Sequence, residues 1–293
     1  MLNKNISTCK FEPSFSARSS DLKAAEKILR RINSCFPAVS ATSGNRRAEL
    51  TLGVKKGEVG VHITNARLNL LRRITRHAQS DIEYVSKKIE SIKHFNVMNC
   101  LENSEMSYLI AKVNKFENPR CGCLYLQIDD GAKTIKDLDH AILLLDCKLP
   151  KDKVSIHKLY IENPNENSIF VPKKKTIVVD SYLGIVDYWD NVVLKWKGLF
   201  KQLLEIDDEN VVFKVALRDE LLSSSDDINA IKNKYPFLDF KKPNSNYIET
   251  LDFSEGDKLM DVVSKKYCLY RPVQANSGSI YKFVNFLKKI FGL

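Results

Sequence analysis

The sequence predicts an α+β fold in which a helix bearing a cysteine packs on an antiparallel sheet. Three observations indicate this class. Apolar residues recur at helical spacing up to about residue 113. From residue 124 the pattern changes to short apolar or alternating runs, which are typical of strands. A helical stripe over residues 189–204 then separates these runs from a last strand-like segment, 211–217.

Length and composition allow one large domain or two modest ones. The chain has 293 residues, of which 44% are hydrophobic, so it can bury a sizeable core. We predict four parts. They are a disordered N-terminus with a linker (1–47), a basic arm made of a hairpin and a helix (48–95), a catalytic core (96–217) and an accessory C-terminal region (218–293).

The N-terminal third is expected to be mainly helical. A short helix over residues 22–35 ends at Pro37. Two alternating runs, 49–54 and 59–63, flank a Lys-Lys-Gly-Glu turn and favour a hairpin. A long helical pattern then opens at Asn65 and continues to Ile92.

The rest of the chain supplies the sheet and two further helices. The continuous apolar run over residues 140–145 is typical of a strand covered on both faces. The other expected elements are strands at 124–128, 154–161, 176–180 and 211–217, a turn at 181–184, a loop at 163–167, and helices at 189–204, 226–234 and 280–291.

The net charge of +10 is concentrated at one end of the chain. Residues 1–95 contain 18 Lys and Arg against 8 Asp and Glu, whereas residues 96–293 contain 28 of each. Such an arm suggests an anionic membrane surface, an acidic protein or a nucleic acid as partner, although a solvated basic face explains the charge equally well. Nucleic acid is the least favoured, because no binding motif accompanies the charge. The basic, aromatic segment 280–291 would either lie on an anionic membrane or dock on the domain.

The cysteines indicate a reducing compartment and no disulfide scaffold, because there are seven of them without paired spacing. The first residues carry no apolar signal segment, and no apolar run reaches membrane-spanning length. Zinc is the one metal to consider, through Cys121, Cys123, Cys147 and His140. Their Cys-x-Cys spacing is not a usual zinc signature, so we expect no metal and no cofactor.

Cys100 stands at a predicted helix start. Asn99 would cap the helix. Glu102, at the third helical position, would complete a capping box in which Asn takes the place of the usual Ser or Thr. A thiol at this end faces the positive end of the helix dipole, which favours the thiolate. The alternative is that Cys100 is a small buried hydrophobe near a helix start.

His140 and Asp180 stand at the edges of two predicted strands. They follow Cys100 at intervals of 40 residues, in the order nucleophile, base and orienting acid. Thiol catalysis needs these three types: a thiolate to attack a carbonyl carbon, an imidazole to move the proton, and a carboxylate to orient the imidazole. The amide N–H of Cys100, at the first turn, would donate to the oxyanion.

Each of these residues also has a simpler interpretation. His140 could be a satisfied histidine at a strand edge, and Asp180 could simply start a turn. His157 is a competing base, within a strand whose edge the sequence does not define. Asp139 is a poor orienting acid for His140, because neighbouring strand residues point to opposite faces of the sheet.

Three short stretches carry a resemblance to a known group: Asn-Cys-Leu-Glu at 99–102, Asp-His-Ala-Ile-Leu-Leu at 139–144 and Val-Val-Asp-Ser-Tyr-Leu-Gly at 178–184. Together they resemble the papain-like cysteine hydrolases delivered by bacterial type III secretion systems, and within that group the protein-glutamine deamidases. The resemblance covers residues 96–190. It implies a papain-like core with Cys100 as nucleophile, His140 as base and Asp180 as orienting acid.

The resemblance also implies a function and a location. The protein would be a virulence effector that is exported by a non-Sec route into the host cell cytoplasm and hydrolyses an amide of a host protein. A secretion chaperone would bind near the N-terminus. The group commonly has Gly after the cysteine, where this chain has Leu101, a side chain that narrows access to the thiol. Glutamine deamidation and peptide cleavage share this chemistry, and the sequence does not separate them.

A non-catalytic function is the alternative. The basic N-terminal arm and the amphipathic segment 280–291 would suit an adaptor that binds a membrane or another protein.

Overall fold

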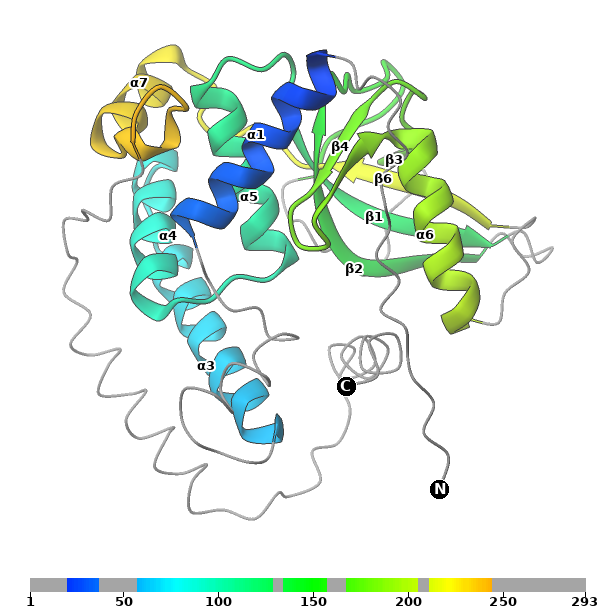
Figure 1. The fold of residues 1–293 in the computed structure, drawn as a ribbon, viewed down its shortest axis with the longest axis horizontal. Helices are drawn as coiled ribbons and strands as arrows, with labels where there is room; N and C mark the ends of the chain where they lie inside the picture. Colours follow the sequence, from blue (N-terminus) through cyan, green and yellow to red (C-terminus); the bar gives the residue numbers. More distant parts are fainter. Residues whose placement is uncertain (1–19, 37–56, 129–133, 157–166, 205–210, 244–293) are drawn as a thin grey trace.

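The computed structural model describes residues 20–36, 57–128, 134–156, 167–204 and 211–243 (Figure 1). This part of the chain contains six α-helices, a short 3-10 helix and one six-stranded sheet, so the α+β class is confirmed. The helices are α1 (Ser20–Cys35), α3 (Gly57–Arg76), α4 (Asp81–Phe95), α5 (Cys100–Val113), α6 (Trp189–Leu204), α7 (Ser225–Lys234) and η2 (Pro236–Leu238). The strands are β1 (Arg120–Ile128), β2 (Thr134–Leu145), β3 (Ile169–Phe170), β4 (Ile177–Asp180), β5 (Ile185–Tyr188) and β6 (Val211–Leu217).

All neighbouring strands of the sheet are antiparallel, and their order is β3-β6-β1-β2-β4-β5. The two longest strands, β1 and β2, lie in the middle, with Leu124 opposite His140. On its other edge β2 pairs with β4, with Leu143 opposite Val179. His140 and Asp180 therefore come from neighbouring strands.

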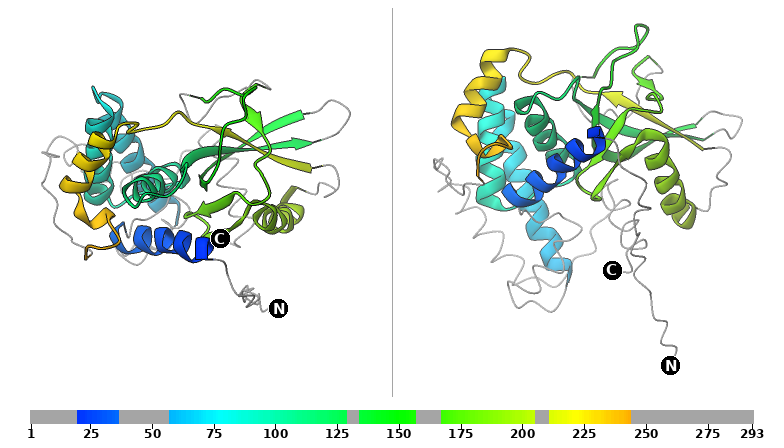
Figure 2. Two further views of the ribbon diagram at one scale, coloured as in Figure 1. Left: turned by 90° about the horizontal axis from the view of Figure 1, so that it is seen from above. Right: turned by 45° about the horizontal axis from the view of Figure 1, so that its top comes forward.

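The sheet divides the core into two parts, because successive side chains of a strand point to opposite faces. On one face, Cys123 and Tyr125 of β1 pack with residues of α1, α3, α4 and α5. On the other face, Leu124 and Leu126 pack with Trp196 of α6. Figures 1 and 2 show α6 standing apart from the layer formed by α3, α4, α5 and α7. The cysteine-bearing helix α5 packs against β1, β2 and β4, on the face of the sheet opposite α6.

One apolar cluster crosses the predicted domain boundaries. It joins Ile28 of α1, Leu71 of α3 and Ile89 of α4 to Leu109 of α5 and Phe237 of η2, and all five side chains are buried. The boundaries themselves stay a prediction. The described helices on either side of residues 96–217 share a core with that segment.

Two predictions about the N-terminal third are wrong. Residues 59–63 are the first turns of α3 and not a strand; the spacing of Val59 and Ile63 also suits one face of a helix. The helix expected over residues 65–92 is two helices, because the chain turns at 77–80 and Ser80 caps α4 by accepting the N–H of Glu83 at 3.2 Å.

The strand expected over residues 154–161 is also not formed in the described part of that range. Ile156 makes an isolated bridge to Arg218, just beyond β6, because both edges of β6 are already occupied by β1 and β3. The short strands β3 and β5 were not predicted. Five other predictions concern segments outside the described residues. They are disorder at 1–19, a linker at 38–47, a strand at 49–54, a loop at 163–166 and a helix at 280–291.

Candidate active site

The helix α5 begins at Cys100, as the sequence predicts. The carboxylate of Glu102 accepts the backbone N–H of Asn99 at 3.1 Å, and the N–H of Asn103 donates to the carbonyl of Asn99 at 2.9 Å. The reach of Glu102 back to the residue before the helix is one half of a capping box, and it satisfies a backbone donor. The cap therefore fixes where the first turn starts and where Cys100 stands.

His140 and Asp180 are in direct contact. The Nε2 atom of His140 lies 2.8 Å from Oδ2 of Asp180, whose side chain is fully buried. The other carboxylate oxygen of Asp180 accepts the backbone N–H of Leu183 at 3.0 Å, within the turn that follows β4. The Tyr182 ring meets the His140 ring edge to face, with centroids 6.0 Å apart. Both sides of the Asp180 carboxylate are thus held, and so is the orientation of the imidazole.

The thiol of Cys100 completes this arrangement. Its side chain is hydrogen-bonded to His140, which has Nδ1 left for the thiol because Nε2 faces Asp180. Burial lowers the pKa of the His140 ring, but the Asp180 carboxylate and the hydrogen bonds with Asp180 and Cys100 outweigh it and raise the pKa to about 10. The structure therefore brings together the three residues singled out from the sequence, and a protonated imidazole is favoured between the thiol and the carboxylate.

The competing residues are placed differently. His157 lies outside the described residues, as does the side chain of Asp139. Cys121 belongs to the apolar cluster on the α5 face of the sheet, whereas Cys147 belongs to the cluster on the α6 face. The sheet therefore separates these two thiols. In the described part of the chain no three His, Cys, Asp or Glu side chains are grouped as metal ligands.

The cysteines of the described residues form no disulfide. Burial raises the pKa of the Cys121 thiol to about 12, and the thiol donates to the carbonyl of Ser104 at 3.6 Å. Its neighbourhood thus suits a neutral thiol. Cys100, beside an imidazole and a helix N-terminus, stands in different surroundings.

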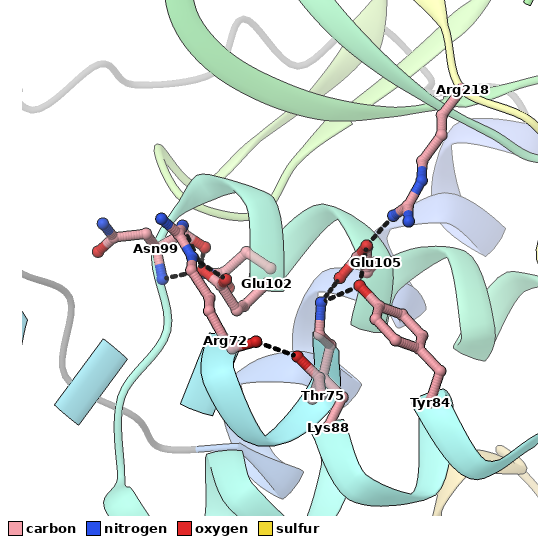
Figure 3. Close-up of polar contacts among 9 residues, drawn as sticks. Arg72, Thr75, Tyr84, Lys88, Asn99, Glu102, Glu105 and Arg218 are labelled. Carbon is pink, nitrogen blue, oxygen red and sulfur yellow. Dashed lines mark hydrogen bonds and ion pairs between the residues drawn. The ribbon is translucent and has the colours of Figure 1, made fainter. Parts of the chain in front are cut away.

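The sequence did not indicate the charged partners of α5. Arg72 of α3 contacts Glu102 with Nε at 3.0 Å and Nη2 at 3.4 Å from the two carboxylate oxygens, so that two hydrogen bonds join the pair. The Glu102 side chain is fully buried and that of Arg72 is one-third exposed. Figure 3 shows the guanidinium of Arg72 meeting Glu102 next to Asn99.

A second buried cluster lies one turn further along α5. The carboxylate of Glu105 receives hydrogen bonds from Lys88 of α4, from Arg218 after β6, and from the hydroxyl of Tyr84 at 2.9 Å (Figure 3). Burial alone would raise the pKa of Glu105, but the two cations lower it. The only sequence signal for either cluster is an acidic residue on a largely apolar helix.

Comparisons with protein families, with curated proteins and with solved structures found no match to this chain. Among the described residues, no helix is both long and apolar enough to cross a membrane.

Proposed function

We propose that this protein is a cysteine hydrolase that cleaves an amide bond of a protein, with Cys100, His140 and Asp180 as its catalytic residues. One observation carries the proposal: the Cys100 thiol at a helix N-terminus is hydrogen-bonded to His140, which is 2.8 Å from the buried Asp180 carboxylate. A nucleophile held by a base that a third group orients is the arrangement required for thiol catalysis.

The proposed reaction proceeds in two steps. The Cys100 sulfur attacks the amide carbonyl carbon while the backbone N–H at the start of α5 donates to the oxyanion. The proton from the thiol, carried by His140, passes to the leaving nitrogen as the carbon–nitrogen bond breaks. Water, deprotonated by His140, then hydrolyses the thioester and restores the thiol. Ammonia leaves in glutamine deamidation and an amine leaves in peptide cleavage.

The resemblance to type III effectors supports the substrate class and the location that we propose, a host protein in the host cytoplasm. Purified protein would be incubated with a host-cell extract and the extract analysed by mass spectrometry. New Gln-to-Glu conversions would indicate a deamidase, and new peptide termini a protease. We expect neither with Cys100→Ala, and a loss of about 10²- to 10⁴-fold with His140→Gln, the range that general base catalysis contributes.

Labelling of the thiols tests the same proposal without a substrate. Iodoacetamide at neutral pH should label Cys100 well ahead of Cys121, which has comparable burial but donates its thiol hydrogen to the carbonyl of Ser104. Labelling of both thiols at the same rate, or unchanged activity of the Cys100→Ala variant, would contradict the proposal.

A second candidate is binding to an anionic surface, which the excess of basic residues in 1–95 favours. Arg76, the last residue of α3, is exposed and fits this function. Sedimentation with vesicles of anionic lipid, at low and high salt and with or without residues 280–293, tests it. Absence of binding at every salt concentration would exclude a membrane adaptor of this kind.

A further inference from the structure

We propose that Arg72 is a positioning residue for Cys100, which acts through Glu102 to hold the start of α5 and to cancel a negative charge in the first turn of that helix. This inference rests on the proposed function and adds to it a residue from outside the resembling stretches. Arg72 belongs to α3, whereas Cys100, His140 and Asp180 come from α5, β2 and β4.

The first argument is a chain of contacts that ends at the nucleophile. The Arg72 guanidinium holds both oxygens of the Glu102 carboxylate, at 3.0 and 3.4 Å. One of these oxygens accepts the N–H of Asn99, the residue directly before Cys100, at 3.1 Å. A two-point contact restrains the plane of the carboxylate as well as its place. The backbone that leads into Cys100 is thereby tied to α3 (Figure 3).

The second argument concerns charge. Glu102 lies two residues after Cys100 and its side chain is fully buried, so its carboxylate is poorly screened by solvent. A negative charge near the N-terminus of the helix opposes a thiolate there, because like charges disfavour ionisation. Arg72 supplies the opposite charge in direct contact. Without it, the buried carboxylate would lose its bonded cation and stay next to the backbone that leads into Cys100.

Several charged groups face this position from the elements around it. His140 from β2 faces the thiol, and Asp180 from β4 contacts the other side of the His140 ring. Glu102 lies on the same helix as Cys100, and Arg72 faces Glu102 from α3. Lys88 of α4 also acts on Glu102 through its charge, but its hydrogen bonds go to Glu105 and Tyr84. Arg72 is the group bonded to Glu102 among these, so its removal should change the charge balance most.

The test is the pH dependence of Cys100 alkylation by iodoacetamide in the full-length protein. We expect Arg72→Gln to shift the alkylation curve upward by about one pH unit, which is about tenfold slower labelling at neutral pH. Arg72→Lys should recover most of the rate, because it keeps the charge and loses only the two-point contact. Arg73→Gln, an exposed neighbour on the same helix, should match the wild type. A purely structural role for Arg72 would lower stability and leave the pH of the transition unchanged.

A second variant keeps the test valid if Arg72→Gln does not fold. The double variant Arg72→Gln/Glu102→Gln replaces the ion pair by two neutral amides, leaves no buried charge unpaired, and should keep the alkylation curve of the wild type. An upward shift in the double variant, or a folded Arg72→Gln with an unshifted curve, would overturn the proposal. If the wild type showed no preferential labelling of Cys100, the proposed function itself would fail, and the two failures are thus distinguished.

Discussion

Replacing Glu105 by Gln tests how the buried charges around it stabilise the position of α5. The Glu105 side chain is 1% exposed and is bonded to Lys88, which is 3% exposed, and to Arg218, which is 16% exposed. The Glu105→Gln variant keeps the size of the side chain and removes its charge. It leaves two cations in one buried site without their anion, and breaking a buried ion pair in this way costs about 3–5 kcal/mol.

The change should be visible in both chemical and thermal unfolding. Urea titration followed by far-UV circular dichroism should show a lower midpoint with a similar slope. The midpoint of thermal unfolding should fall by about 6–20 °C, from about 2–4 °C per kcal/mol for large domains. Glu117→Gln is the matched control. Glu117 lies in an exposed position after α5, so its loss of charge should change stability by no more than about 0.5 kcal/mol.

A second substitution separates the charge effect from lost packing. Lys88→Met in the Glu105→Gln background removes one of the two unpaired cations, and we expect it to restore about 1–3 kcal/mol. If Glu105→Gln cost less than about 1 kcal/mol, or if Lys88→Met only added to the loss, the cluster would not hold α5 through its charges.

Three further predictions concern the site and one helix cap. The pKa of His140 is raised to about 10, so its contribution to stability is complete below about pH 6.5 and is lost as the pH rises toward 10. In urea titrations from about pH 7 to 8.5, the free energy of unfolding should therefore fall more steeply with pH for the wild type than for His140→Gln. Leu101→Gly should speed iodoacetamide labelling of Cys100, because it opens the approach to the thiol. It should also cost about 1 kcal/mol or more of stability, because it removes a partly buried side chain from a helix. An unchanged labelling rate in folded protein would show that Leu101 does not restrict access to the thiol. Ser80→Ala removes the acceptor for the Glu83 N–H at the start of α4 and should cost about 1 kcal/mol in the same titration, and no measurable loss would mean that the cap contributes nothing.

The elements that carry the site were predictable because their signals are local. The start of α5 follows from Asn99 and Glu102, which act within one helical turn. The strand that carries His140 follows from an uninterrupted apolar run, and β4 ends at Asp180 where the turn residues begin. The contact between His140 and Asp180 was expected from residue types and strand edges, and the roles of these residues in catalysis stay a prediction.

Features that depend on distant partners were not predictable from the sequence. Arg72 and Glu102 are 30 residues apart and Glu105 and Arg218 are 113 apart; in sequence, such charges resemble ordinary solvated surface. The break between α3 and α4 is different, because Ser80 followed by Glu83 is a local signal for a helix start; it was overlooked because the apolar pattern continues across it and no Gly or Pro marks it. The hairpin prediction failed because residues spaced to suit a strand also suited the helix that formed.

The position of α1 has a consequence for the order in which the chain can fold. Arg31 donates to the carbonyls of Phe240 and Lys242, and the Cys35 thiol donates to that of Phe237, over sequence separations of 202 to 211 residues. These hydrogen-bond partners of α1 are therefore synthesised 202 to 211 residues after it. At about 5–20 residues per second, α1 waits about 10–40 s for them.

During this interval the apolar stripe of α1, which includes the buried Ile28 and Ile32, has only part of its final cover. A chain that ends before residue 236 never completes that cover. Among the described residues, the first helix packs on the last turn, so that the described core can be completed only after most of the protein has been made.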